Sequence, residues 1–280
     1  MRPRILQVDG QIGFRWATPD GSPTSLQELV VDDDEPDRLV ATHLAALDDA
    51  LIIAAERFGD LLGGGRRPVG PEERDGLLGL HRVLDRLCHE FALAAQSTGI
   101  AADVRAGQII GTAALFSIRA RLPLDLLGPA PLDGELDEPV VGMVSGFGDM
   151  VQVDPDRPWA GGRWIVRTES GRRYPLTLST LLFDSSGTRK DAARAEHRDA
   201  IRSVLAAAES AAADPFAVAC ALDWLLYDFL MAHRDGPDSA AIVLGKGREP
   251  DAGLIVAAAA ASVAARAVYG AVRNPEVVDL

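Results

Sequence analysis

The sequence predicts a helix-rich α+β protein with about six helices, an antiparallel β meander and an N-terminal hairpin. Three observations predict this class. Hydrophobic residues make up 48% of the 280-residue chain, which is enough for a packed core. Several long segments repeat apolar side chains at helical spacing. Between residues 140 and 182, shorter apolar runs alternate with glycine, proline and serine breaks, and breaks this short favour antiparallel neighbours.

The strands are expected in two groups. Near the N-terminus, two apolar runs flank Asp9-Gly10, a pair typical of a two-residue hairpin turn, and a third run follows. These strands are predicted over residues 5–8, 11–16 and 26–31. The meander is predicted over residues 140–145, 150–153, 163–168 and 174–182.

Helical spacing of apolar residues predicts six helices, of which Gly63-Gly64-Gly65 ends the first and Pro71 begins the second. Their expected ranges are residues 37–62, from 71 onward, 101–121, 190–212, 215–233 and 252–272. No internal repeat is evident. We expect a single domain over residues 1–280, with a sub-boundary at the linker of residues 128–139, which is rich in proline, glycine and acids.

The charge and the cysteines limit the partners and the location. A net charge of -13 repels phosphate backbones and anionic lipid surfaces, so neither nucleic acid nor a membrane is expected as a partner. Cys88 and Cys220 lie in predicted helices among apolar neighbours, which fits free thiols in a reducing compartment. No signal-peptide pattern follows Met1. We therefore expect a cytoplasmic protein, and the excess of arginine over lysine indicates a GC-rich bacterial genome.

Residues 142–148 resemble the glycine pattern of short-chain dehydrogenases, in which backbone amides approach a pyrophosphate at a helix N-terminus. A helix must follow the last glycine of that pattern, whereas residues 150–155 read as a strand ended by a turn. We therefore interpret the glycines as a hairpin turn and expect no cofactor.

Residues 181–188 resemble the first motif of haloacid-dehalogenase-like phosphatases, in which an aspartate at a strand end attacks phosphorus. The resemblance places Asp184 at the nucleophile. The same motif has a general acid two residues later, and here that position is Ser186, which cannot supply the proton at neutral pH. The alternative is a strand-to-helix connection with Thr188 as the helix N-cap. Phosphatase chemistry at Asp184 is therefore disfavoured.

His81, Asp85 and His89 recur every four residues, a spacing at which one helix face could offer metal ligands. The row drifts away from the apolar seam of its helix, so a solvated face is the better interpretation. No metal site is expected.

The segment 215–233 is apolar on both faces, which is typical of a helix that is buried all round or serves an interface. One face carries Trp224, Tyr227 and Met231. We interpret these three residues as an interaction surface for a protein partner or a second copy of the chain.

Asp223 and Asp228 interrupt this apolar helix, and a carboxylate in such surroundings needs a partner. Arg105, Gln108 and Arg119 form a polar stripe on the segment 101–121. The expected arrangement is an ion pair between one of the aspartates and Arg105 or Arg119, or a ligand pocket at the same place.

No cluster combines a nucleophile, a base and oxyanion donors, so the sequence does not decide whether the chain is an enzyme. It favours a non-catalytic protein that binds another protein or assembles with itself. The alternative is an enzyme or small-molecule binder with a pocket between residues 101–121 and 215–233. The sequence indicates no biological pathway.

Overall fold

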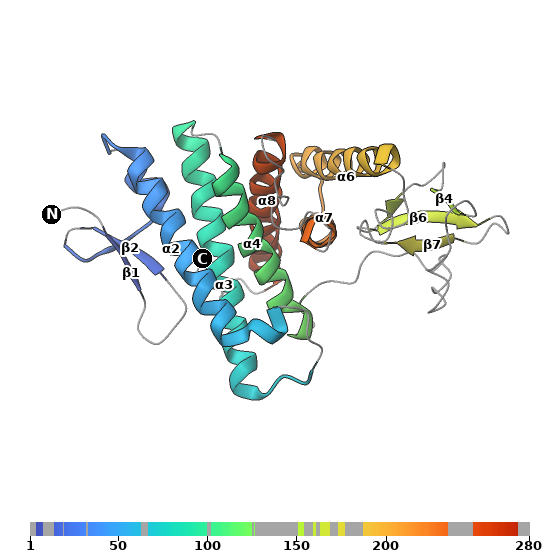
Figure 1. The fold of residues 1–280 in the computed structure, drawn as a ribbon. Helices are drawn as coiled ribbons and strands as arrows, with labels where there is room; N and C mark the ends of the chain where they lie inside the picture. Colours follow the sequence, from blue (N-terminus) through green and yellow to red (C-terminus); the bar gives the residue numbers. More distant parts are fainter. Residues whose placement is uncertain are drawn as a thin grey trace.

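The computed structural model describes residues 4–7, 14–18, 20–31, 33–62, 67–99, 102–124 and 126, the strand residues 151–153, 159–160, 163–168 and 173–176, and residues 187–234 and 249–273. Helices dominate these residues, and strands form two small antiparallel sheets (Figure 1). The chain is therefore helix-rich, with β structure a minor part. The linker 128–139 and the predicted strand 140–145 lie outside the described residues.

The six predicted helices are confirmed. They are α2 (Pro36–Leu62), α3 (Pro71–Thr98), α4 (Val104–Arg121), α6 (Gly187–Ala208), α7 (Pro215–Arg234) and α8 (Glu249–Arg273). The cap residues explain two of the boundaries. Asp103 accepts a hydrogen bond from the Ala106 amide at 2.7 Å at the start of α4, and Gly99 ends α3 in a left-handed conformation with φ 70°.

The strand predicted over residues 26–31 is wrong, because this segment forms the short helix α1 (Leu26–Val31). A capping box decides the conformation. The Glu28 amide donates to Ser25 Oγ at 3.2 Å, and the Ser25 amide donates back to Glu28 Oε2 at 3.1 Å. Leu26 and Val30 then lie one turn apart on the buried face.

The N-terminal sheet consists of β1 (Arg4–Gln7), β2 (Phe14–Ala17) and β3 (Pro23–Thr24), all antiparallel. Gln7 pairs with Phe14, so six residues separate the strands and the predicted two-residue turn at Asp9-Gly10 is wrong. That turn would pair Gln7 with Ile12. A shift of two residues keeps every side chain on its face of the sheet, so the apolar alternation does not distinguish the two registers.

The second sheet consists of β4 (Val151–Val153), β5 (Trp159–Ala160), β6 (Arg163–Thr168) and β7 (Arg173–Leu176). β6 pairs antiparallel with each of the other three strands. The meander strands predicted at 150–153 and 163–168 are confirmed by β4 and β6, and β7 matches the start of the strand predicted at 174–182, of which residues 177–182 lie outside the described residues.

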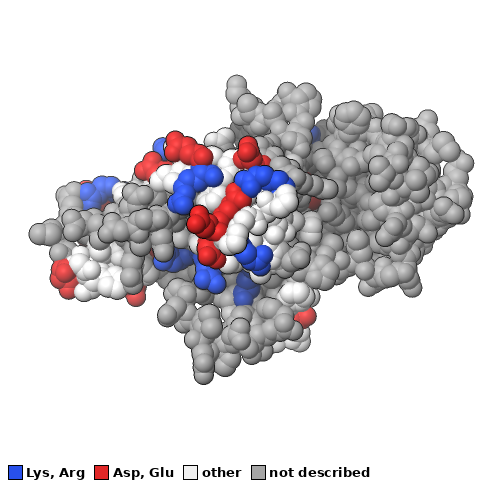
Figure 2. Space-filling view, turned by 90° about the horizontal axis from the view of Figure 1, so that it is seen from below, with Lys and Arg blue, Asp and Glu red and all other residues white. Residues whose placement is uncertain are grey.

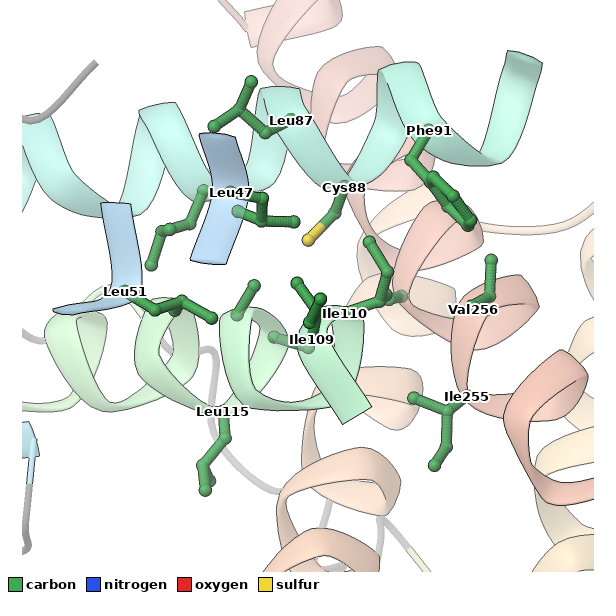
Figure 3. Packing of buried hydrophobic residues seen from close by; sticks show 14 of the residues in the cluster. Leu47, Leu51, Leu87, Cys88, Phe91, Ile109, Ile110, Leu115, Ile255 and Val256 are labelled. Carbon is green, nitrogen blue, oxygen red and sulfur yellow. The ribbon is translucent and has the colours of Figure 1, made fainter. Parts of the chain in front are cut away.

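The core lies where α2, α3, α4 and α8 stand side by side (Figure 1), and α7 packs against α8 and α6. Figure 3 shows side chains from four helices meeting there, with the Cys88 sulfur directed into the apolar interior. Leu47, Phe91, Ile110 and Ile255 are fully buried. Burial of aliphatic and aromatic side chains of this size contributes about 1.5–3 kcal/mol each.

A chain of hydrogen bonds ties the N-terminal sheet to this core. Trp16 Nε1 donates to His43 Nδ1 at 3.0 Å, and His43 Nε2 donates to the Leu87 carbonyl oxygen at 2.8 Å. Trp16 and His43 are both buried. Burial lowers the pKa of His43 to about 4, which outweighs the opposing effect of its bond to Leu87, so the ring stays neutral near pH 7.

The two halves of the described chain have related orders of elements. We call residues 4–124 the first repeat and residues 151–273 the second repeat. Each contains a small antiparallel sheet, in which β2 pairs with two strands and β6 with three, and then three long helices: α2, α3 and α4 in one, α6, α7 and α8 in the other. The register of the last two strands also repeats, with the pairs Trp16 and Thr24, Ala17 and Pro23 in the first repeat and Val166 and Tyr174, Arg167 and Arg173 in the second.

The long helices of the repeats share residues at equivalent positions. Leu84-Asp85 and Phe91 of α3 correspond to Leu222-Asp223 and Phe229 of α7. The pattern Ser-x-x-x-Arg occurs at residues 117–121 of α4 and 262–266 of α8. The expectation that the chain has no internal repeat is therefore wrong.

Equivalent contacts accompany these shared residues. His197 of α6 is buried, and its Nε2 donates to the Leu225 carbonyl oxygen at 3.0 Å, as His43 Nε2 does to Leu87. The connections between elements differ in length, so no fixed period links the halves in the sequence.

Candidate functional site

Asp223 lies in a buried cluster of charges where the two repeats meet. Its Oδ2 is 2.6 Å from Arg121 Nη1, and its Oδ1 is 2.6 Å from Arg266 Nη1. Arg266 Nη2 also lies 2.9 Å from Asp85 Oδ2. We call these four residues the ion network. α3, α4, α7 and α8 each contribute one of them, so it joins the helices that form the centre of the fold.

Two serines complete the ion network with the same geometry in each repeat. Ser117 Oγ donates to Asp85 Oδ1 at 2.5 Å, and Ser262 Oγ donates to Asp223 Oδ1 at 2.5 Å. Each aspartate therefore bonds the serine of its own repeat and the arginine of the other. These four contacts are related by a pseudo-twofold axis, and the pair of Asp223 with Arg266, within the second repeat, is additional to them.

The electrostatics of the ion network are balanced, with two carboxylates facing two guanidinium groups. Burial alone would raise the pKa of Asp223, but Arg121 and Arg266 outweigh it and hold that pKa below its usual range. Asp85 behaves likewise: Arg266 and the His81 hydrogen bond overcome burial and hold its pKa low. The carboxylates raise the pKa of Arg266 against the effect of its burial. Asp85, Asp223 and Arg266 therefore stay charged at neutral pH.

The helices close tightly around the ion network. The cavity beside it measures about 10 Å³, at the limit of what one water molecule requires. Cys88 lines this cavity, and burial together with the Asp85 charge raises the pKa of its thiol, so it stays protonated. This cavity is too small for a ligand, and the predicted pocket between residues 101–121 and 215–233 stays a prediction. The ion network has the character of a structural contact.

The predicted ion pair involves different arginines from those expected. Asp223 pairs with Arg121 and Arg266, not with Arg105 or Arg119. Arg119 is buried, with its guanidinium carbon 5.7 Å from the centroid of the Tyr227 ring and Nη2 donating to Met231 Sδ at 2.8 Å. Asp228 is buried on α7. The prediction from the polar stripe failed because it considered the positions of residues on one helix, whereas the partner of Asp223 depends on how α4, α7 and α8 pack together.

Arg105 and Gln108 are exposed and line a shallow surface groove of about 400 Å³ between α2 and α4. Phe116 also lines this groove. We call it the first groove, because it belongs to the first repeat.

The predicted interaction surface on α7 is half-buried. Trp224 and Tyr227 meet edge to face with ring centroids 6.0 Å apart, and Met231 contacts Arg119. α7 also contacts β6. These side chains therefore have contacts within the chain, and their role in an interface stays a prediction.

The predicted solvated face of α3 is wrong for Asp85, whose side chain is 13% exposed and paired with Arg266. His81 Nδ1 lies 3.7 Å from Asp85 Oδ2, and His89 is half-buried. Within the described residues, no group of three or more histidine, cysteine, aspartate or glutamate side chains is placed to hold a metal ion.

The two motifs that resemble enzyme families lie outside the described residues, both at 142–148 and around Asp184. α6 begins at Gly187, so Thr188 lies inside its first turn and is not its N-cap.

The described chain also has an open apolar groove of about 900 Å³, which we call the second groove. It lies between α3, α6, α7 and α8. Small and medium-sized side chains of α8 form its floor: Gly253, Val256, Ala257, Ala260, Ala261, Ala264, Ala265 and Val268. Its walls are formed by Leu93 and Gln96 of α3, Leu205 of α6 and Val218 of α7, and Glu209 is the charged residue among the described residues of the lining.

The second groove occupies the place in the second repeat that the first groove occupies in the first. Leu51 of α2 corresponds to Leu205 of α6, and both line their grooves beside the last helix of the repeat. Sequence reasoning missed this surface. The alanine-rich row on α8 was a signal for it, since a row of small side chains on a long helix leaves room for another element.

In the described part of the face seen in Figure 2, acidic and basic side chains are interspersed. That part offers no single-sign surface to a highly charged partner. No helix in the described part of the chain is both long and apolar enough to cross a membrane. Comparison with protein families, with curated proteins and with solved structures finds no match to the chain.

Proposed function

We propose that this chain is a non-catalytic, cytoplasmic protein-interaction module that binds a partner protein in the second groove. The observation that carries the proposal is the groove itself: it is apolar, open to solvent and far larger than the cavity at the ion network. Apolar concavities of this extent on a folded surface typically mark binding sites. The two buried free cysteines support a reducing compartment.

A partner protein is favoured over a small molecule by the polar groups of the second groove. A small-molecule site buries most of its ligand and orients it with several converging polar groups. The described lining instead offers a long alanine floor, with Gln96, Glu209 and Ser210 as its larger polar side chains. Such a surface suits the close approach of another polypeptide.

A partner is also favoured over a second copy. α8 forms the floor of the second groove, so two copies would present concave faces to each other and could not interlock there. Self-association through Trp224, Tyr227 and Met231 stays a separate prediction, which light scattering at tens of micromolar tests.

Site-specific photo-cross-linking in the cells that make the protein tests the proposal. Ala257 is exposed on the floor of the second groove, and Ala41 is an exposed alanine on α2 outside it. A photoreactive residue at position 257 should cross-link one defined protein, and the same residue at position 41 should not. That protein, once purified, should bind the purified chain. Equal cross-linking at both positions, or none at position 257, contradicts the proposal.

A further inference from the structure

The second groove exists because large side chains of the first repeat are replaced by small ones in the second. Aligning Ser117 with Ser262 places Gln108, Thr112, Phe116 and Arg119 of α4 opposite Gly253, Ala257, Ala261 and Ala264 of α8. Each of these α8 residues lines the second groove.

The contacts of Arg119 indicate which kind of side chain could occupy the space beside its counterpart in the second repeat, Ala264. In the first repeat, Arg119 is buried against the Tyr227 ring and beside Met231. Met231 corresponds to Leu93, and Leu93 lines the second groove together with Ala264, the counterpart of Arg119. The volume that a long basic side chain fills in one repeat is therefore part of the groove in the other. Likewise, Ala261 of the second groove is the counterpart of Phe116, which contributes an aromatic ring to the first groove.

The dimensions of the second groove indicate a helix. Its floor runs from Gly253 to Val268 along α8, which is about 22 Å at 1.5 Å per residue. The second groove is open to solvent, so a helix lying along it buries one face and keeps the other in water. Such a helix requires an amphipathic sequence.

Charge indicates the polar residues of that helix. Glu209 lines the second groove where the first repeat has Ala55, and the chain as a whole carries a net charge of -13. A helix with lysine or arginine beside its apolar stripe is attracted by the Glu209 carboxylate and by the negative net charge of the chain.

We infer that the second groove binds a basic amphipathic helix of about four turns, presented by a partner protein, whose aromatic or large aliphatic side chains enter the space above Ala261 and Ala264. The inference rests on the proposed function, because it names the class of partner for the same groove. It differs from that proposal in fixing the shape, the charge and the anchor residues of the ligand.

Fluorescence anisotropy with three labelled sixteen-residue peptides tests the inference. The first has leucine and phenylalanine at helical spacing and lysine elsewhere, the second has the same composition in scrambled order, and the third has glutamate in place of lysine. The first peptide should bind at least tenfold more tightly than either control and gain helical circular dichroism on binding. Equal affinity for the first and scrambled peptides, or no binding of the first, overturns the inference.

Variants that restore the first repeat's residues locate the binding. The double variant Ala261→Phe/Ala264→Arg fills the second groove and should weaken binding of the first peptide at least tenfold. Ala257→Arg, at an exposed position, should do the same if the double variant fails to fold, and Ala41→Arg is the matched control that should bind like the wild type. Unchanged affinity in both groove variants overturns the inference.

The two proposals fail separately. If a partner is cross-linked at position 257 but the peptides do not bind, the results support the proposed interaction module and contradict the inference of a basic helix. Absence of any cross-linked partner removes the interaction module itself.

Discussion

Replacing Asp223 by alanine should strand a buried cation and destabilise the fold strongly. The Asp223 carboxylate makes three contacts of 2.5–2.6 Å, to Arg121, Arg266 and Ser262. Arg266 keeps Asp85 as a partner, but the side chain of Arg121 is 2% exposed and loses the carboxylate it faces. Removing one member of a buried ion pair costs about 3–5 kcal/mol of unfolding free energy.

Urea denaturation measures this loss. With a slope of about 3 kcal/mol per molar urea, the midpoint should fall by about 1 M or more. Asp199→Ala is the control, because Asp199 forms an exposed pair with Arg202 and should cost under about 1 kcal/mol. The double variant Asp223→Ala/Arg121→Met should be more stable than the sum of its single changes predicts, since it removes the stranded charge. A midpoint for Asp223→Ala equal to that of Asp199→Ala would refute the reasoning.

Three further predictions concern the core. In the folded chain the pKa of His43 is lowered to about 4, so as pH falls below about 6.5 the unfolded chain binds a proton at this histidine before the folded chain does. The free energy of unfolding should therefore decline by up to about 1.4 kcal/mol per pH unit from pH 6.5 towards pH 4. Denaturation at several pH values measures this slope, which should be smaller in His43→Gln. A flat profile contradicts this. Gly76→Ala should lower the free energy of unfolding by about 1–3 kcal/mol, because a Cβ at this position would lie 2.7 Å from the Phe58 ring. Gly79→Ala places its Cβ in open space and should raise the free energy of unfolding by about 0.5–1 kcal/mol. Thermal melting compares the two variants, and equal shifts of their melting temperatures would contradict the packing argument. Cys88 should react with a thiol reagent only after unfolding, since burial raises its pKa, and rapid labelling of the native chain would show that account to be wrong.

Long periodic segments made the helices predictable from the sequence. Each of the six predicted helices exceeds the length at which apolar spacing separates helix from strand. α1 was missed because a segment of six residues is too short for its apolar spacing to separate helix from strand, and the choice depended on the capping box between Ser25 and Glu28. The hairpin register was missed because shifts of two residues preserve the faces.

The site was less predictable, because its contacts join residues far apart in the chain. The sequence indicated correctly that Asp223 needs a cation, but it could not say which arginine packing would supply. The repeats were missed because connections of unequal length hide their correspondence. The Ser-x-x-x-Arg pattern on α4 and α8 was the available signal, and it would have directed attention to Arg121 and Arg266.

The affinity of the cross-linked partner, measured by titration calorimetry, tests most directly the claim that the second groove is the binding surface. The partner would be titrated into the wild-type chain, into Ala257→Arg and into the matched control Ala41→Arg. The account predicts equal affinity for the wild type and Ala41→Arg, and at least tenfold weaker binding to Ala257→Arg, a loss of about 1.4 kcal/mol or more. Equal affinity for all three proteins would contradict it.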